Sequence, residues 1–122
     1  MDVTGLDHVV LVVTDAEASV RWYSDVLGLG AERLDEWRSG AAPFVSVRVS
    51  AMTVIDLLEG SVTGRNVDHI ALVVNGVDLD EVAARADLDV ASGPSRVWGA
   101  QGWGMGLYLR DPDGHVIEIR TY

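Results

Sequence analysis

Two histidines occupy equivalent positions in a segment that the sequence contains twice. Residues 6–13 consist of an apolar residue, Asp7, His8 and five apolar residues, and residues 67–74 repeat this pattern around His69. Both segments are typical of buried strands, in which each imidazole shares a face with apolar side chains. Burying a polar group without a partner costs about 1–3 kcal/mol. The repeat therefore predicts that something binds both imidazoles.

Two carboxylates recur in the same way. Asp56 stands in the apolar segment 54–57, and Glu118 takes the matching place in segment 116–119, 62 residues later. Two imidazoles with one or two carboxylates form a site that suits Fe, Mn, Ni, Co or Zn. A bound cation would offset the cost of burying all of these groups together. We therefore predict a site for one divalent metal ion of open identity, with the candidate ligands His8, His69, Glu118 and Asp56.

Composition and charge restrict the class of protein. With 122 residues, the chain has room for one domain or for two half-domains that share a core. It has no apolar run of the roughly 20 residues that cross a membrane and no secretory signal pattern, so we expect a soluble, cytoplasmic protein. The absence of Cys excludes disulfides, thiol nucleophiles and zinc–thiolate sites. A net charge of −10 disfavours binding to nucleic acid and to anionic membranes.

The repeat extends to the predicted secondary structure, which is β-α-β-β-β in each half. In the first half, strand 6–13 precedes a helix with a capping box that starts at Thr14 and an end at Gly28. Three strands follow it, at about 31–37, 43–50 and 53–59. Residues 60–66 are the best candidate for a linker between the halves.

The second half has the same order. Strand 67–74 precedes a short helix that is capped by Asp78 and ends near Ala86. Strands follow near 88–91, 95–98, 105–111 and 115–121, and one boundary among these four segments is blurred by the glycines at 99, 102, 104 and 106. We therefore expect one α+β domain, residues 1–122, built from the modules 1–60 and 66–122.

The turn after Asp111 determines which residue faces Glu118. A three-residue Pro-Asp-Gly loop pairs Asp111 with His115 and so places Tyr108 opposite Glu118. Tyr108 would then lie on the metal face, where its hydroxyl could donate a hydrogen bond to a substrate oxygen. Under another register, Tyr108 packs on the far face. We expect His115, one residue past the turn, to be exposed.

Aromatic and basic residues are candidates for contacting a substrate. Indoles at strand ends and in glycine-rich segments favour a flat or apolar ligand, and the candidates are Trp37, Trp98 and Trp103. Arg48 and Arg96 are candidates for binding an anionic substrate group, or else lie on a solvated strand face. The glycine-rich segment 99–106 is not followed by a helix that could bind phosphate, so we expect a flexible flap over the site.

Together, these segments resemble the vicinal-oxygen-chelate superfamily, which includes glyoxalase I, extradiol dioxygenases, fosfomycin-resistance proteins, methylmalonyl-CoA epimerase and bleomycin-resistance proteins. The resemblance covers essentially the whole chain and rests on four segments: 6–9, 22–29, 67–70 and 111–118. It implies a glyoxalase-like open barrel of two βαβββ modules around a divalent metal, with His8, His69 and Glu118 at ligand positions. Asp56 stands where glyoxalase I has a Glu, so this shorter side chain is expected either to bind the metal directly or to bind a water on it.

The same resemblance implies a function. It implies a metal-dependent enzyme that acts on a small organic substrate by lyase or isomerase chemistry, in which the metal chelates substrate oxygens. Asp56 and Glu118 are the candidate bases for proton transfer. Two alternatives stay open: a ligand-binding protein without catalysis, like the bleomycin-resistance branch, and an extradiol-type dioxygenase.

The short linker bears on assembly. Because residues 60–66 restrict how freely the two halves fold back on each other, we expect exchange between chains in a homodimer. In that arrangement, His8 and Asp56 of one chain would lie beside His69 and Glu118 of the other.

Overall fold

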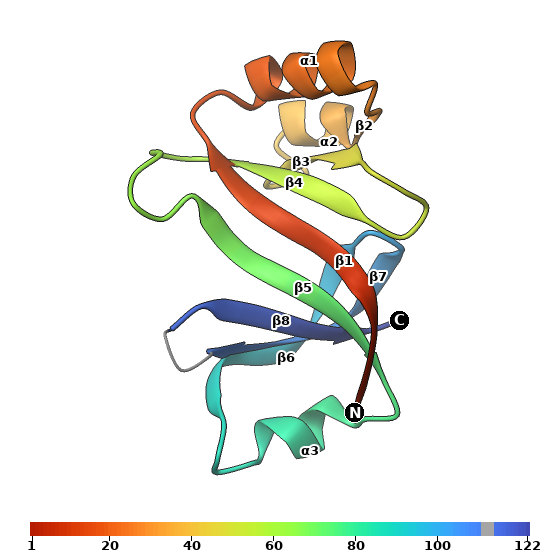
Figure 1. Cartoon of the computed structure of the whole chain (residues 1–122), viewed down its shortest axis with the longest axis vertical. Helices are drawn as coiled ribbons and strands as arrows, with labels where there is room; N and C mark the ends of the chain where they lie inside the picture. The colour runs from red at the N-terminus through yellow and green to blue at the C-terminus, as the bar shows by residue number, and fades with distance from the viewer. Residues whose placement is uncertain (111–113) are drawn as a thin grey trace. The chain divides into compact units, whose positions relative to one another are not determined.

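The computed structural model describes residues 1–110 and 114–122, apart from the side chain of Leu27, and it confirms the predicted α+β class (Figure 1). In this part of the chain, two series of elements follow one another. The first is β1 (Asp2–Val13), α1 (Ala16–Leu27), β2 (Ala31–Glu32), α2 (Leu34–Arg38), β3 (Val45–Arg48) and β4 (Val54–Glu59). The second is β5 (Val67–Asn75), α3 (Leu79–Ala83), β6 (Asp89–Gly99), β7 (Gly102–Arg110) and β8 (Val116–Thr121). Each series has the predicted βαβββ order, and the first gains a short extra helix.

Two compact units divide the chain differently from the sequence repeat. The terminal unit consists of Met1–His8 and His69–Tyr122, and the central unit consists of Val9–Asp68. Strands β1 and β5 therefore each run through both units. The terminal unit joins the first residues of the chain to its second half, which brings His8 into the same unit as His69 and Glu118.

In the central unit, β3 pairs antiparallel with both β2 and β4. Helix α1 packs Ala16 and Val20 against this sheet, in a core completed by Val45, Val47 and Leu57. The helix ends where predicted, because Gly28 adopts the left-handed conformation with a φ of 70°. Residues 60–66 contain neither helix nor strand and connect β4 to β5, as expected of a linker.

Two local predictions in the central unit are wrong. The strand expected at 31–37 stops at Glu32, because Arg33 adopts a left-handed φ of 61° and α2 follows. Trp37 consequently lies on a helix. The N-cap of α1 is Asp15 instead of Thr14, since the Asp15 Oδ1 accepts the Ala18 N–H at 2.9 Å.

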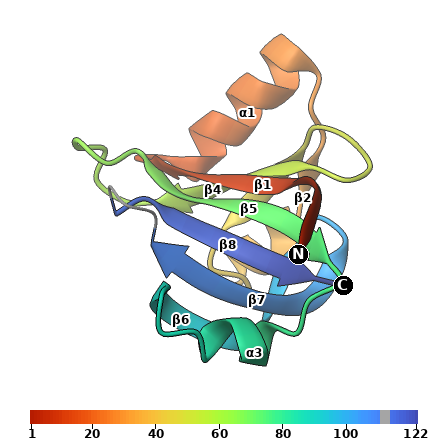
Figure 2. The ribbon, with the colours of Figure 1, turned by 60° about the horizontal axis from the view of Figure 1, so that its bottom comes forward.

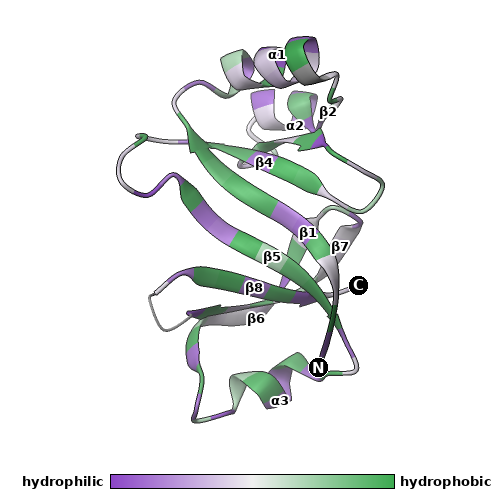
Figure 3. Ribbon diagram, viewed as in Figure 1, coloured by the Kyte–Doolittle hydropathy of each residue, from purple (hydrophilic) through white to green (hydrophobic). Residues whose placement is uncertain are grey.

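The terminal unit contains a mixed sheet in the order β5-β8-β7-β6. Strand β5 runs parallel to β8, and β7 pairs antiparallel with β8 and β6 (Figure 2). Helix α3 begins at the predicted cap, where Asp78 Oδ1 accepts the Asp80 N–H at 2.8 Å. The core of this unit consists of the buried residues Val74, Leu79, Val82, Leu107 and Ile119. Helix α3 and strand β8 both contribute to it, and their apolar residues are green in Figure 3.

The two strands predicted at 88–91 and 95–98 are one strand, β6, with irregular register between Val90 and Ser95. The prediction of a flexible flap at 99–106 is also wrong. This segment contains the end of β6, a turn at Ala100 and Gln101, and the beginning of β7. The predicted turn at 111–113 lies outside the described residues. No helix in the described part of the chain is both long and apolar enough to cross a membrane.

The N-cap of α1 generates a prediction about stability. We expect Asp15→Ala to lower the free energy of unfolding by about 1 kcal/mol, because the Ala18 N–H loses its acceptor. Denaturant unfolding followed by circular dichroism measures this change. Thr14→Ala is the matched control and is expected to cost much less. An equal loss in both variants would instead support a capping role for Thr14.

Candidate metal centre

Three strands of the terminal unit bring together His8, His69 and Glu118, which we call the His–His–Glu group. The Nε2 atoms of His8 and His69 lie 2.9 Å apart. Glu118 Oε2 lies 3.3 Å from His8 Nε2 and 3.2 Å from His69 Nε2. The three ligand atoms thus lie within 4.8 Å of one another. One nitrogen from each imidazole and one carboxylate oxygen face a common point.

The donor set and its burial fit a divalent cation. His8 and Glu118 are 2% and 1% exposed, and the side chain of His69 is 12% exposed. Two imidazole nitrogens and one carboxylate oxygen form the two-histidine, one-carboxylate set that binds Fe(II) and similar ions. A cation at the common point would satisfy the lone pairs of both imidazoles and the charge of the carboxylate together. These residues therefore fit the predicted metal.

Asp7 determines which nitrogen of His8 faces the group. Its carboxylate accepts hydrogen bonds from His8 Nδ1 at 2.7 Å, the Ala100 N–H at 2.9 Å and the Tyr122 hydroxyl at 2.5 Å. Burial alone would raise the pKa of Asp7, but these hydrogen bonds and the charge of Arg120 lower it overall. Because a charged carboxylate only accepts hydrogen bonds, the proton of His8 lies on Nδ1. The Nε2 lone pair then faces His69 and Glu118, which is the orientation that a metal ligand requires.

Glu118 is charged at neutral pH. Burial would raise the pKa of Glu118, but hydrogen bonds with His69 and His8 and the positive charge of Arg120 lower it to about 2. The Arg120 Nη1 donates to Glu118 Oε1 at 3.0 Å, which leaves Oε2 on the side of the two imidazoles. Such a carboxylate suits the role of an anionic ligand better than that of a base.

Tyr108 lies where the first of the two predicted registers places it. Strand β7 pairs Tyr108 with Glu118 of β8. The Tyr108 ring also contacts the His69 imidazole edge-on, with centroids 5.4 Å apart and an angle of 86° between the planes. The phenol is therefore a neighbour of the His–His–Glu group, as required of a residue that would contact a substrate there.

Other candidate site residues lie in the central unit. Asp56 is 2% exposed, and its Oδ1 accepts a hydrogen bond from the Ser46 hydroxyl at 2.5 Å. Arg48 makes a bidentate ion pair with Glu32, in which both N···O distances are 2.8 Å. Trp37 packs against the core of its unit. The roles predicted for Asp56, Arg48 and Trp37 stay predictions.

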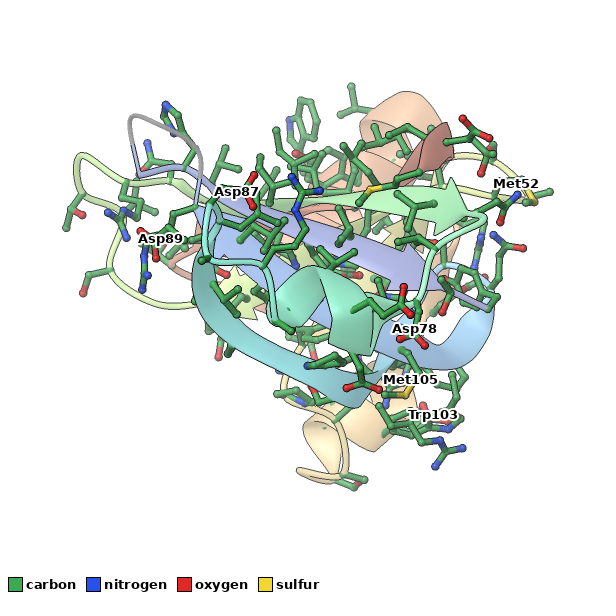
Figure 4. All side chains as sticks on the ribbon, turned by 90° about the horizontal axis from the view of Figure 1, so that it is seen from below. Met52, Asp78, Asp87, Asp89, Trp103 and Met105 are labelled. Carbon is green, nitrogen blue, oxygen red and sulfur yellow. The ribbon has the colours of Figure 1, made fainter. Side chains whose placement is uncertain are left out.

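Trp98 and Trp103 form an aromatic pair on the β6–β7 hairpin. They face each other across the two strands, and their rings meet edge-on at 5.4 Å. The Arg96 guanidinium lies 4.4 Å from the Trp103 ring. Trp103 and Met105, both labelled in Figure 4, are 51% and 41% exposed. The predicted contact of Trp98 and Trp103 with a substrate stays a prediction.

Three residues around the group were missed in the sequence: Asp7, Arg120 and Tyr122. The signal for Asp7 was ambiguous, because Asp68 precedes His69 in the same way but is exposed, whereas Asp7 is fully buried. The signal for Arg120 was clearer. The repeat with an offset of 62 residues aligns this arginine with Leu58, so a charge replaces an apolar residue in a strand. No pattern in the sequence singled out Tyr122.

The His–His–Glu group forms within one chain. All three residues lie in the terminal unit of a single chain. The expected exchange, in which His8 and Asp56 of one chain lie beside His69 and Glu118 of another, stays a prediction. The N-terminal part of β1 supplies His8 to this unit. Exchange between chains is therefore not required to assemble the three ligands. His115, the remaining histidine, is exposed as predicted.

Comparisons with known proteins agree with this architecture. Virulence protein STM3117 of Salmonella typhimurium is 29% identical over 126 residues, covering 100% of this chain and 87% of the relative. Fosfomycin resistance protein FosX of Mesorhizobium japonicum is 26% identical over 127 residues, covering 98% of this chain and 86% of the relative. The solved structure of the Mn(II)-bound glyoxalase from Novosphingobium aromaticivorans is similar with a TM-score of 0.73 and 26% identity, covering 98% of this chain and 39% of that chain.

The sequence profile of one family matches almost the entire chain. It is described as the Glyoxalase/Bleomycin resistance protein/Dioxygenase superfamily, and it matches residues 5–119. This range includes the His–His–Glu group and all of the described helices. The chain therefore belongs to the Glyoxalase/Bleomycin resistance protein/Dioxygenase superfamily.

Proposed function

We propose that this chain is a metal-dependent enzyme that acts on a small organic molecule by glyoxalase-like lyase or isomerase chemistry. The observation that carries the proposal is the buried His–His–Glu group, in which Asp7 fixes the orientation of His8. The Mn(II)-bound glyoxalase among the similar solved structures supports it. The fosfomycin resistance relative supports a small organic molecule as the substrate.

The three residues of the group would hold one divalent ion, with Fe, Mn, Ni, Co and Zn as the candidates. When bound, such an ion supplies Lewis-acid polarisation of adjacent substrate oxygens. Tyr108, beside His69, would donate its hydroxyl hydrogen to a substrate oxygen and so orient the substrate. Trp98 and Trp103 would contact a flat or apolar part of the substrate.

Proton transfer is assigned to Asp56 in preference to Glu118. The low pKa of Glu118, about 2, makes its carboxylate a weak base. Asp56 is the other buried carboxylate that the sequence repeat singles out, and its hydrogen bond with Ser46 orients it. Asp56 would take a proton from the substrate at its carboxylate, which accepts a hydrogen bond from the Ser46 hydroxyl.

The two alternatives differ in what they require of the group. A ligand-binding protein of the bleomycin-resistance kind has no need of one buried and one partly buried imidazole that face a buried carboxylate. A dioxygenase would use the same ligands but would consume oxygen. Oxygen uptake by the Fe(II)-loaded protein with candidate aromatic diols distinguishes this activity from lyase or isomerase chemistry.

Metal binding is the first test of the proposed function. After reconstitution with each of Fe(II), Mn(II), Ni(II), Co(II) and Zn(II), elemental analysis is expected to find about one ion per chain for at least one metal. His8→Ala and His69→Ala are expected to lose most of it, because each removes one of three ligands. His115→Ala is the control, since His115 is exposed and outside the group. A wild-type protein that retains none of these ions supports the binding-protein alternative.

The division of roles between the two carboxylates is the second test. Glu118→Ala is expected to lose metal, whereas Asp56→Ala is expected to keep it and to lose activity by about 10–100-fold, typical of a group outside the metal ligands. Calorimetric titration with Mn(II) and an activity assay on the same preparations separate the two effects. Equal loss of metal in the two variants would make Asp56 a fourth ligand.

We also propose that the chain is a homodimer. The first five residues of β1 are exposed and include the apolar side chains of Val3 and Leu6, 58% and 41% exposed. A second copy that covers this strand would remove them from water. Light scattering is expected to give twice the mass of one chain, and Val3→Lys is expected to shift the protein towards the monomer. A wild-type protein with the mass of one chain at micromolar concentration contradicts the dimer.

A further inference from the structure

The glycine-rich segment 99–106 leaves space for buried side chains. A Cβ atom added at Gly99 would collide with the Arg120 guanidinium. One added at Gly106 would lie 2.8 Å from Glu118 Oε1 and 2.8 Å from Val97 Cγ2. One added at Gly104 would collide with the Thr121 carbonyl oxygen. Glycine backbone on β6 and β7 therefore provides a recess in which Arg120 and Glu118 fit.

Arg120 is fully buried in this recess. Its Nη1 donates to Glu118 Oε1 at 3.0 Å and to the Trp98 carbonyl at 3.2 Å, and its Nη2 donates to the Val97 carbonyl at 3.2 Å. Its Nε has no hydrogen-bond partner among the described residues. A buried ion pair with an unsatisfied donor is a poor source of stability. The guanidinium compensates the buried charge of Glu118, and its geometry also determines which carboxylate oxygen it engages.

The sequence repeat indicates that the arginine and one of the glycines belong together. With an offset of 62 residues, Arg120 aligns with Leu58 of the first half, and Gly106 aligns with Phe44. In the terminal unit, Gly106 and Arg120 are direct partners across β7 and β8. Two apolar residues in one half thus correspond, in the other half, to a charge and to a glycine that leaves space for the carboxylate paired with that charge.

We infer that Arg120 is a positioning residue of the metal centre, which holds Glu118 so that a single carboxylate oxygen faces the metal. The guanidinium donates a hydrogen bond to Glu118 Oε1, while Glu118 Oε2 faces the Nε2 atoms of His8 and His69. Glu118 then supplies one ligand atom, and the remaining coordination positions stay open for substrate oxygens. This inference rests on the proposed metal-dependent function.

Two physical effects of Arg120 on metal affinity have opposite signs. Its positive charge repels a cation, so a purely electrostatic role predicts tighter metal binding when the charge is removed. Positioning of the carboxylate predicts weaker binding, because a Glu118 side chain that Arg120 no longer holds must lose rotational freedom when it binds the metal. The sign of the change in affinity therefore distinguishes the two effects.

The test compares Co(II) and Mn(II) binding by the wild type, Arg120→Met and Arg110→Met. Arg110 lies on β7 with an exposed side chain that pairs with Asp89, so Arg110→Met is the matched control. Arg120→Met is expected to bind Mn(II) about 10–100-fold more weakly, as for other losses around metal ligands. Its Co(II) absorption spectrum, which reports coordination number, is expected to change, whereas Arg110→Met is expected to match the wild type in both measurements.

Unchanged or tighter Mn(II) binding by a folded Arg120→Met, with an unchanged Co(II) spectrum, would overturn the inference. If circular dichroism shows that this variant does not fold, the same two measurements on Arg120→Lys test the inference instead. A lysine keeps the charge but offers one ammonium in place of the planar guanidinium, so weaker binding and a changed spectrum are again expected. A folded Arg120→Lys with wild-type binding and spectrum would overturn it. If the reconstituted wild type holds none of the five candidate metals, the proposed function fails first, and if it holds only another of them, the same comparison of variants is made with that ion.

Discussion

Two buried carboxylates in the terminal unit require compensation, and much of the surrounding structure provides it. Asp7 and Glu118 are almost completely removed from water, and a single guanidinium, that of Arg120, lies beside both. Burying like charges this close is unfavourable unless hydrogen bonds and opposite charges surround them. The backbone N–H of Ala100 and the hydroxyl of Tyr122 complete the shell around Asp7. The imidazoles of the His–His–Glu group are oriented by these two anions.

The sequence predicted the His–His–Glu group but not the residues that surround it, and the difference has a physical cause. His8, His69 and Glu118 were found because a polar residue in an apolar strand is conspicuous and because the chain contains the pattern twice. The register of Tyr108 with Glu118 followed from the length of a turn. Asp7 and Asp68, in contrast, have nearly identical local sequences and opposite burial. Burial depends on packing from distant segments, which a local pattern does not contain.

The errors in secondary structure have a similar origin. Trp37 lies in a segment whose apolar residues recur at every third position, which does not fit the alternation of a strand. The left-handed backbone of Arg33 and an ion pair between Arg38 and Glu17 accompany the helix that forms there. The glycine-rich segment suggested flexibility, since glycine lowers the cost of disorder. In the structure, its glycines are needed for close packing, which is a second and opposite use of the same residue type.

The two halves of the chain have diverged at equivalent positions of their sheets. Ser46 pairs with Asp56 across β3 and β4, and Tyr108 pairs with Glu118 across β7 and β8 at the same place in the repeat. A residue with a hydroxyl group is paired with an acidic residue in each case, and Glu118 also accepts a hydrogen bond from Arg120. The first half has Leu58 at the position where the second half has this buried cation.

The hydrogen bond between Tyr122 and Asp7 joins residues 115 positions apart in the chain. A ribosome releases Asp7 and His8 long before it adds Tyr122, so Asp7 lacks this partner while the residues between them are synthesised. Contacts between such distant positions have a high entropic cost of loop closure, and proteins rich in them fold slowly. The central unit, whose residues 9–68 are contiguous, can form while the chain is still being made. The terminal unit is then the last part of the molecule to form.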